Sequence, residues 1–274
     1  MSHNPLGQQT EYISEYAPHL LFPIARSESR KQLDINAGLP FFGVDIWTGY
    51  ELSWLDKSGK PVVAVAEFTI PCDSECIIES KSFKLYLNSF NQTRFNNVDE
   101  VRAIIIGDLS RAAKADVNVQ ILPLRGVGGD NYLGIIALPN AIYLDDLDVA
   151  IDAYHPAPEL LKVGVDLVEE TLVSHLLKTN CPVTGQPDWA SVFVRYKGNQ
   201  IVHDNLLRYL ISFREHQDFH EHCVERIFCD LLRVCKPEYL SVYARYTRRG
   251  GLDINPFRST HAWEKPEGIR LIRQ

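Results

Sequence analysis

The sequence lacks a long apolar run, since no stretch approaches the roughly 20 residues that a membrane-spanning helix requires. Its first residues, Met1 to Leu6, lack the basic start and the apolar centre of a signal peptide. Excess positive charge is also missing, because the 274 residues carry a net charge of −7. Nucleic acid is bound by clustered positive charge and is therefore not expected as the main partner. These absences predict a cytoplasmic protein without a membrane segment.

Two familiar kinds of site are also missing from the sequence. Cys72 and Cys76 have a spacing that could ligate zinc or form a redox pair, but no clear second Cys or His pair completes a site. We therefore expect no metal, with structural zinc as a minor alternative, and six reduced thiols. A Gly-x-Gly-x-x-Gly turn between a strand and a helix is absent, and residues 126–129 (GVGG) are too weak a fingerprint to replace it.

An internal repeat is the main feature that the chain does contain. Residues 86–90 (YLNSF) recur as residues 209–213 (YLISF), and each copy lies between a strand-like stretch and a helical pattern that leads into a short apolar strand. A five-residue match can arise by chance, but the matching order of elements favours a duplication. The expected elements are strands at 62–68, 117–122, 191–196 and 240–246, and helices at 98–115 and 221–235.

This order predicts an α+β protein with antiparallel sheets, built from two modules. We place the modules at residues 1–145 and 146–274, with a linker around the glycine-rich residues 126–131 and the acidic residues that follow them. Residues 42–54 and 61–70 are typical of a hairpin.

Two further segments have less regular patterns. Residues 161–167 alternate apolar and other side chains, which predicts a strand that continues to residue 177 with a change of phase near Glu169. A helix is the alternative for that segment. The C-terminal tail is rich in Arg and Pro and is expected to be irregular.

Cys181 is the candidate nucleophile. It begins a turn-prone loop that contains Pro182, Gly185 and Pro187, and such a loop can present a thiol at a pocket. The plainer interpretation is a buried cysteine that acts as a small hydrophobic side chain. The cysteines of the predicted helix at 221–235 are expected to be packing residues, namely Cys223, Cys229 and Cys235.

Acid–base groups accompany this cysteine. Asp188 lies across the same loop, where it suits a general acid, although a turn or capping role beside Pro187 explains it equally well. A free thiol is mostly protonated at neutral pH, so a base must take its proton. Asp188 or His220 could do so, but proximity alone does not distinguish His220 from the neighbouring His216 and His222.

Residues 79–86 (ESKSFKLY) gather a carboxylate, two hydroxyls and two ammonium groups. This density suits a site that holds both a polar heterocycle and an anionic cofactor. Taken alone, Glu79 is explained as an exposed strand-end charge, and Glu221 as a helix N-terminal acid that the dipole favours. Two basic clusters suit cofactor phosphates, although each is otherwise a solvated turn: Ser80-Lys81 with Lys84, and Arg245 with residues 247–251.

Together, residues 79–86, residues 181–188 (CPVTGQPD) and the triplet Phe219-His220-Glu221 resemble the signature of the NADPH-dependent 7-cyano-7-deazaguanine reductases, the nitrile reductases of queuosine biosynthesis. Residues 246–256 (YTRRGGLDINP) also fit the C-terminal pattern of that family. The resemblance covers most of the chain. It implies tandem tunnelling-fold modules, with helices packed on one face of each antiparallel sheet, and association into a homodimer or larger ring.

The resemblance also implies roles for individual residues. Cys181 would add to the nitrile carbon while Asp188 protonates the nitrogen, and two NADPH molecules would reduce first the thioimide and then the imine. The imine hydrolyses if it is released, so the site must hold it and exclude water. Substrate contacts are carried over to Ile78, Glu79, Ser80, His220 and Glu221, and NADPH contacts to Ser80, Lys81, Arg249 and Gly250.

Two alternatives stay open. A tunnelling-fold cyclohydrolase that acts on a pterin or purine would share the carboxylate that grips the heterocycle. It would need a catalytic zinc or a water-activating set, for which the sequence offers no convincing ligands. A non-catalytic purine-binding or assembly module would tolerate the replacement of Cys181.

Overall fold

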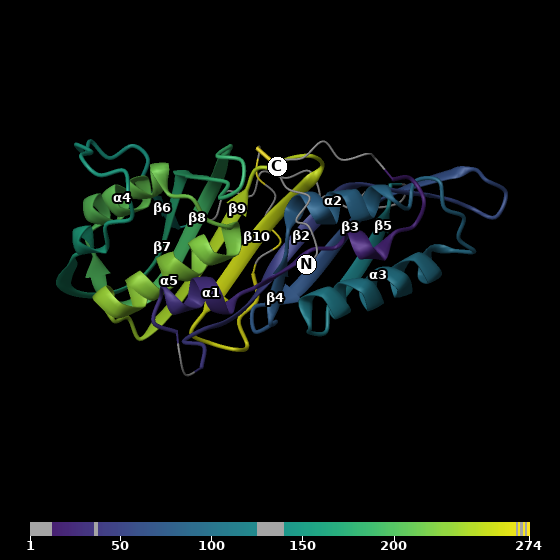
Figure 1. The fold of residues 1–274 in the computed structure, drawn as a ribbon. Coiled ribbons are helices and arrows are strands. Elements are labelled where there is room, and N and C mark those ends of the chain that lie inside the picture. The colour runs from purple at the N-terminus through teal and green to yellow at the C-terminus, as the bar shows by residue number, and fades with distance from the viewer. Residues whose placement is uncertain (1–12, 36–37, 125–139, 267, 269–270, 272) are drawn as a thin grey trace. The chain divides into compact units, whose positions relative to one another are not determined.

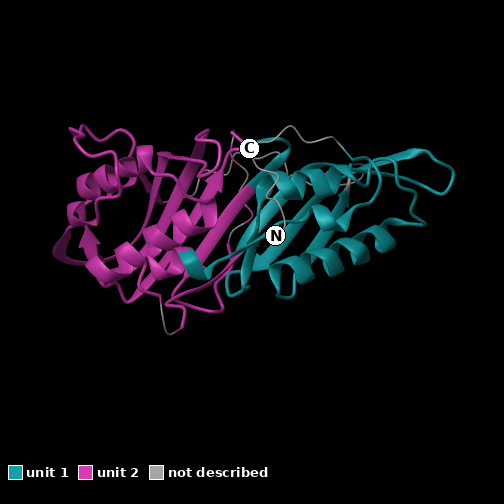
Figure 2. Ribbon diagram, viewed as in Figure 1, with its two compact units in different colours: residues 1–28, 45–134, 248–253 teal, residues 29–44, 135–247, 254–274 magenta. Residues whose placement is uncertain are grey.

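The computed structural model describes residues 13–35, 38–124, 140–266, 268, 271, 273 and 274. It divides into two compact units, each assembled from separate stretches of the chain (Figure 2). Unit 1 consists of residues 1–28, 45–134 and 248–253, and unit 2 of residues 29–44, 135–247 and 254–274. The modules proposed at 1–145 and 146–274 stay a prediction.

Unit 1 contains a sheet with the strand order β5-β3-β2, in which β3 and β5 are antiparallel (Figure 1). Strands β2 (Phe42–Leu55) and β3 (Pro61–Pro71) form the predicted hairpin. Its turn is held by Asp56, whose carboxylate accepts hydrogen bonds from the backbone N–H groups of Ser58 (2.8 Å) and Lys60 (3.0 Å). The remaining elements are β5 (Asn118–Pro123), the antiparallel pair β1 (Pro23–Ala25) and β4 (Cys76–Ile78), and helices α2 (Ser80–Asn88) and α3 (Val98–Ala113).

Unit 2 contains a sheet with the strand order β10-β9-β8-β7-β6 (Figure 1). Strands β7 to β10 pair in antiparallel fashion, and only the short β6 runs parallel to its neighbour β7. Helix α5 packs against β9. The elements are β6 (Ala141–Tyr143), β7 (Val163–Asn180), β8 (Pro187–Ile201), β9 (Tyr239–Tyr246), β10 (Leu252–Ser259), α4 (His203–Ile211) and α5 (His220–Cys235), while the short α1 (Ser27–Lys31) spans both units.

Each unit has its own apolar core. In unit 1, Phe83 of α2 lies 4.9 Å from Phe68 and 5.1 Å from Trp47, measured between ring centroids, and all three side chains are buried. In unit 2, the consecutive residues Val192, Phe193 and Val194 of β8 are all buried, so this strand is covered on both faces. Figure 1 shows the helices on one face of each sheet, and in unit 2 a second apolar cluster forms around Phe193, with Val173, Tyr243 and Phe257.

The predicted repeat is confirmed down to individual hydrogen bonds. In unit 1 the Tyr86 hydroxyl donates to Asp108 at 2.8 Å, and in unit 2 the Tyr209 hydroxyl donates to Asp230 at 2.8 Å. Each tyrosine lies in the sequence match, and each acid lies in the helix that follows. The two units thus share the α+β composition expected of tandem tunnelling-fold modules, with two helices on an antiparallel sheet in each.

Two expectations from the sequence differ from the structure, and a third falls on residues that it does not describe. Residues 163–180 form one strand as predicted, but the register of β7 shifts at 163–167 and 174–177 rather than near Glu169. The segment 252–259 of the tail forms strand β10 despite Pro256, so the expectation of an irregular tail was wrong there. The glycine-rich residues 126–131 lie outside the described residues.

Within the described residues, no helix is long and apolar enough to cross a membrane.

Candidate functional site

The Cys181 loop is the tight connection of a β-hairpin in unit 2. Strand β7 ends at Asn180, β8 begins at Pro187, and the Cys181 N–H donates to the Gln186 carbonyl at 2.8 Å. The Gly185 N–H donates back to the Cys181 carbonyl at 3.0 Å. Gly185 has a φ of +67°, a conformation that glycine adopts without strain. The sequence thus fixes the backbone of Cys181 from both sides, and the side chain is 8% exposed.

Asp188 stands beside this loop, as the sequence predicts. It is the second residue of β8, lies opposite Thr179 of β7, and is 6% exposed. The Nε2 atom of His220 lies 3.4 Å from its Oδ2 atom. The structure therefore brings Asp188 and His220, predicted from separate motifs, into one pair.

Helix α5 begins beside the loop because the chain before it is fastened to Asn180. The Asn180 N–H donates to the His216 carbonyl at 2.8 Å, and the Asp218 N–H donates to the Asn180 carbonyl at 3.2 Å. His220 and Glu221 are the first two residues of α5, and Glu221 is 3% exposed. A buried carboxylate at this position faces the positive end of the helix dipole.

Asp218 is a half-buried acid that the sequence motifs did not single out. Its carboxylate lies 3.5 Å from His216 Nε2 and 3.3 Å from His222 Nδ1. Burial alone would raise the pKa of Asp218, but the hydrogen bonds from both imidazoles outweigh it and hold that pKa well below its ordinary value. The spacing of His222, four residues after Asp218 at a helix start, was the available signal.

Of the other cysteines of α5, Cys223 and Cys235 are buried at 0% and 5% exposure, as expected of packing residues, whereas Cys229 is half-buried and lines a cavity. Burial raises the pKa of the Cys223 and Cys229 thiols to about 12 and that of Cys235 to about 11. Such thiols stay protonated and inert at neutral pH. In the described part of the chain, no group of three or more His, Cys, Asp or Glu side chains is arranged to hold a metal.

Glu79 differs from the exposed strand-end charge that the sequence suggested. It is 3% exposed and is the N-cap of helix α2. Its two carboxylate oxygens accept from the backbone N–H groups of Lys81 (2.8 Å) and Ser82 (2.7 Å). The residue before it, Ile78, is the buried end of β4. Residues 80–88 are therefore a helix, and Glu79 is held rigidly at its positive end.

The predicted cofactor residues of unit 1 lie on two neighbouring elements. A tight turn at 249–252 is closed by hydrogen bonds between the backbones of Arg249 and Leu252, and Gly250 and Gly251 have φ values of +60° and +78°. Glu51 connects this turn to α2. It pairs with Lys84, and a side chain at Gly251 would meet its carboxylate at about 2.5 Å.

Arg245 does not join that basic cluster. It lies in unit 2, is 9% exposed, and donates to the Tyr243 hydroxyl (2.8 Å) and to the side chain of Gln274 (2.7 Å). The site residues predicted from sequence therefore fall into two groups. Unit 1 carries Ile78, Glu79, Ser80, Lys81, Arg249 and Gly250, and unit 2 carries Cys181, Asp188, His220 and Glu221.

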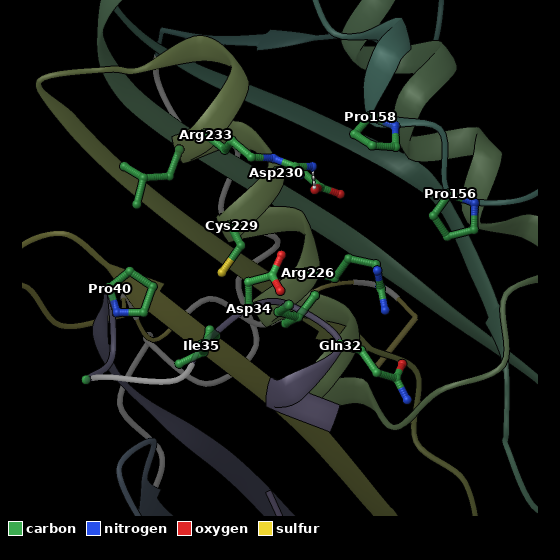
Figure 3. Close-up of a pocket in the computed structure, with 13 residues that line it drawn as sticks. Gln32, Asp34, Ile35, Pro40, Pro156, Pro158, Arg226, Cys229, Asp230 and Arg233 are labelled. Carbon is green, nitrogen blue, oxygen red and sulfur yellow. Dashed lines mark hydrogen bonds and ion pairs between the residues drawn. The ribbon is translucent and has the colours of Figure 1, made fainter. Parts of the chain in front are cut away.

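A cavity of about 640 Å³ in unit 2 is separate from these residues (Figure 3). It lies where residues 32–35, 38 and 40 and the prolines Pro156 and Pro158 face α5. Helix α5 lines it with residues 226–233, whereas the candidate site uses the first two residues of that helix. Asp230 at its wall is already bonded to Arg233 and Tyr209, so the cavity holds no unpaired acid at that point.

The similarity of this chain to known proteins extends over its whole length. Residues 12–121 match the family profile described as "Nitrile reductase, 7-cyano-7-deazaguanine-reductase N-term", and residues 187–265 match the profile described as "QueF-like protein". Among curated proteins, the "NADPH-dependent 7-cyano-7-deazaguanine reductase" of Bordetella avium is 58% identical over 276 residues and covers 100% of this chain and 99% of its own length. The protein of the same name from Dechloromonas aromatica is 56% identical and covers 99% and 95%.

Among solved structures, the apo form of the archaeosine synthase QueF-Like aligns with 35% of this chain and 94% of its own chain. The sequence identity is 17% and the TM-score is 0.30, a likeness too slight to bear on the fold.

Proposed function

The chain belongs to the family of NADPH-dependent 7-cyano-7-deazaguanine reductases, and from this premise we propose how its residues reduce the nitrile of 7-cyano-7-deazaguanine. The product is 7-aminomethyl-7-deazaguanine, in queuosine biosynthesis. The observation that carries the residue assignment is the hairpin loop of unit 2, where Cys181 and Asp188 stand together and His220 lies 3.4 Å from Asp188.

Cys181 is assigned as the nucleophile. Its sulfur forms a bond to the nitrile carbon, one C–N π bond breaks, and the nitrogen takes a proton from Asp188, which gives a thioimide. NADPH, when bound, supplies the hydride for each of the two reductions. After the first, the C–S bond breaks and the thiolate leaves. The low exposure of Cys181 and Asp188, 8% and 6%, supports a site that keeps water from the imine.

The Asp188–His220 pair is assigned to proton movement. The thiol of Cys181 must lose a proton before it attacks, and the nitrile nitrogen must gain one as the bond forms. Asp188 can do both in turn, because the proton it takes from sulfur is the one it gives to nitrogen. His220 Nε2, 3.4 Å from Asp188 Oδ2, holds the carboxylate in place during this exchange.

Glu79 and Glu221 are assigned to the heterocycle. Both are buried, so a base that lacks matching N–H donors would leave a buried carboxylate unpaired, at a high cost in binding free energy. This cost favours a deazaguanine over such a base. Glu79 already accepts two backbone hydrogen bonds and one from the Ser80 hydroxyl at 3.4 Å, and a carboxylate has about four acceptor positions, so about one remains for an N–H donor of a deazaguanine. The contacts of Ile78, Ser80 and His220 with the substrate belong to the same proposal.

NADPH phosphates are assigned to the basic residues of unit 1. Lys81 is in the first turn of α2 and can offer its ammonium group to a phosphate, while the backbone N–H groups of Lys81 and Ser82 are already bonded to Glu79. Gly250 has open space where a side chain would be, so a phosphate oxygen can approach the backbone beside Arg249. These donors fit a phosphate. Replacing Arg249 with Ala should raise the KM for NADPH about tenfold or more, without a matching fall in kcat.

A homodimer is supported by the outer edge of the unit 2 sheet. Val165 and Leu167 of β7 are 91% and 75% exposed, and β6 pairs only with residues 171–173 farther along that strand. An exposed apolar edge strand is a template for pairing, and a second copy of the chain would cover it. We also infer a cytoplasmic location, with no nucleic acid or membrane as partner, from the charge and the reduced thiols.

The test is NADPH oxidation with 7-cyano-7-deazaguanine, measured for the wild type, Cys181→Ala and the control Cys229→Ala. Two NADPH consumed per nitrile, no turnover in Cys181→Ala and full turnover in Cys229→Ala are expected. No oxidation by well-folded wild type would overturn the assignment. In that case metal analysis would distinguish a cyclohydrolase from a non-catalytic purine-binding module, which is indifferent to Cys181.

A further inference from the structure

The imidazole of His220 lies face to face with the phenol ring of Tyr246. The ring centroids are 3.7 Å apart and the ring planes differ by 2°. Of the ring pairs in the described part of the chain, this is the shortest and the most nearly parallel. Tyr246 is the last residue of β9 and is fully buried at 0% exposure.

The backbone of Tyr246 is held on both sides by side chains. Its N–H donates to the Asn255 Oδ1 atom at 3.1 Å, and its carbonyl accepts from the Gln274 Nε2 atom at 3.0 Å. The same Nε2 atom donates to Asn255 Oδ1 at 3.0 Å, which closes the arrangement. Asn255 and Gln274 are buried at 0% and 5% exposure. The backbone of Tyr246 is therefore held by Asn255 and Gln274, while helix α5 packs against its strand.

The stack determines which way the His220 imidazole faces. An imidazole near a reacting group is usually oriented by a hydrogen bond to its second ring nitrogen. In His220 that nitrogen, Nδ1, is buried and makes no hydrogen bond to any residue that the structure describes. Rotation of the ring about its Cβ–Cγ bond by less than a half-turn would break the parallel contact with Tyr246. The ring plane is therefore set by packing, with Nε2 3.4 Å from Asp188 Oδ2.

We propose that Tyr246 is a positioning residue for nitrile reduction, which fixes the plane of the His220 imidazole so that Nε2 faces Asp188. The inference rests on the proposed function, since His220 and Asp188 matter to catalysis only if Cys181 adds to the nitrile. The aromatic ring performs this role, and the hydroxyl does not. Tyr246→Phe and Tyr246→Leu therefore separate the two parts of the side chain.

The first readout is the NMR spectrum of the His220 ring protons in the full chain. A proton that lies over an aromatic face is shifted upfield by the ring current, and the signals are assigned by their loss in His220→Gln. Tyr246→Phe should keep the upfield position, and Tyr246→Leu should move the signals downfield. This measurement requires no substrate.

The second readout is kinetic. A misplaced group near the reacting atoms costs on the order of 10²-fold in rate, so kcat should fall about 10- to 100-fold in Tyr246→Leu while the KM for NADPH is unchanged. Tyr246→Phe should stay within a few-fold of wild type. The matched control is Tyr196→Leu, which removes an equally buried tyrosine from β8 away from His220. It should lower the melting temperature but leave kcat unchanged where the protein is folded.

Three results would overturn the inference: wild-type kcat in Tyr246→Leu, unmoved His220 signals, or an equal loss of kcat in Tyr196→Leu. If Tyr246→Leu does not fold, Gln274→Ala replaces it. The proposal is then contradicted if the His220 signals and kcat both stay as in the wild type. Failure of the proposed function has a different signature. The wild type would then not reduce the nitrile, while the His220 signals would still respond to Tyr246→Leu.

Discussion

The two units have the same scaffold but different helix starts. In each, the serine of the repeated segment donates to the carbonyl of the repeated tyrosine at 2.6 Å, through Ser89 in unit 1 and Ser212 in unit 2. Each serine also accepts from the backbone N–H of an alanine far back in the chain, at 3.1 Å and 3.2 Å. These bonds hold the ends of helices α2 and α4, and duplication has preserved them.

The starts of the helices have diverged. Helix α2 is capped by the Glu79 carboxylate and α3 by the Asn97 side chain. Helices α4 and α5 of unit 2 begin after Val202 and Phe219, which provide no side-chain cap. The candidate site residues Glu79, His220 and Glu221 all lie at these starts. Side chains that the repeat keeps serve the fold, and these proposed site residues lie where the copies differ.

The largest effect that would sharpen this contrast is expected from Asp188→Asn. An amide cannot supply the proton that the nitrile nitrogen needs, so kcat should fall about 10²- to 10⁴-fold. Steady-state NADPH oxidation measures the loss. Asp204→Asn, an exposed acid in the first turn of α4, is the control and should leave kcat unchanged. Equal losses in the two variants would contradict the assignment of Asp188.

A smaller effect compares the duplicated tyrosines. Tyr209→Phe removes a buried hydrogen bond to a carboxylate and should cost about 1.5–3 kcal/mol of unfolding free energy. Tyr86→Phe should cost less, because Asp108 keeps a second hydroxyl donor in Tyr16, at 2.7 Å. Urea unfolding of both variants measures the difference. The comparison fails if Tyr86→Phe is the more damaging change.

Next in size is the loss of the acidic cap. Glu79→Ala leaves the Lys81 and Ser82 N–H groups without their acceptor and should lower stability by about 0.5–2 kcal/mol. Glu221 is not an N-cap, so Glu221→Ala should weaken substrate binding with a smaller loss of stability. Thermal unfolding and the KM for 7-cyano-7-deazaguanine are measured for both variants. Equal stability losses would show that the two helix starts do not differ in this respect.

The last prediction concerns how stability depends on pH at Asp218. Its pKa is lower in the folded protein than its ordinary value of 3.8, so the folded state binds this proton more weakly than the unfolded state. The resulting stabilisation is complete above about pH 4 and is lost as the pH falls through the lowered pKa. Between roughly pH 5 and pH 2, the free energy of unfolding should fall less steeply with decreasing pH in Asp218→Asn than in the wild type. An unchanged acid slope would contradict this role.

Much of the fold follows from patterns within short stretches of sequence. Helix α5 has an apolar stripe, β7 alternates, and the turn of the β2–β3 hairpin has its Asp and Gly. Strand β10 was missed because Pro256 argues against a strand, yet the segment pairs with β9 at residues 257–259. The helix that follows Glu79 was missed because the cap is Glu rather than the usual Ser, Thr, Asp or Asn.

The candidate site could be predicted where a motif is continuous in sequence. Cys181 and Asp188 share one loop, and His220 and Glu221 are adjacent. The ring of Tyr246 against His220, the Asp218 carboxylate between two imidazoles and the burial of Arg245 depend on segments that meet only after folding. A single sequence does not encode such contacts as a local pattern.

The discontinuous make-up of unit 1 also bears on how the chain is synthesised. Residues 248–253 belong to this unit, where the Tyr50 N–H donates to the Gly251 carbonyl at 3.0 Å and the Tyr50 hydroxyl donates to Asp253 at 2.7 Å. The ribosome makes that segment after nearly all of unit 2. Unit 1 therefore cannot be completed during translation of its own first part, and the turn at Arg249 and Gly250 is among the last pieces to join it.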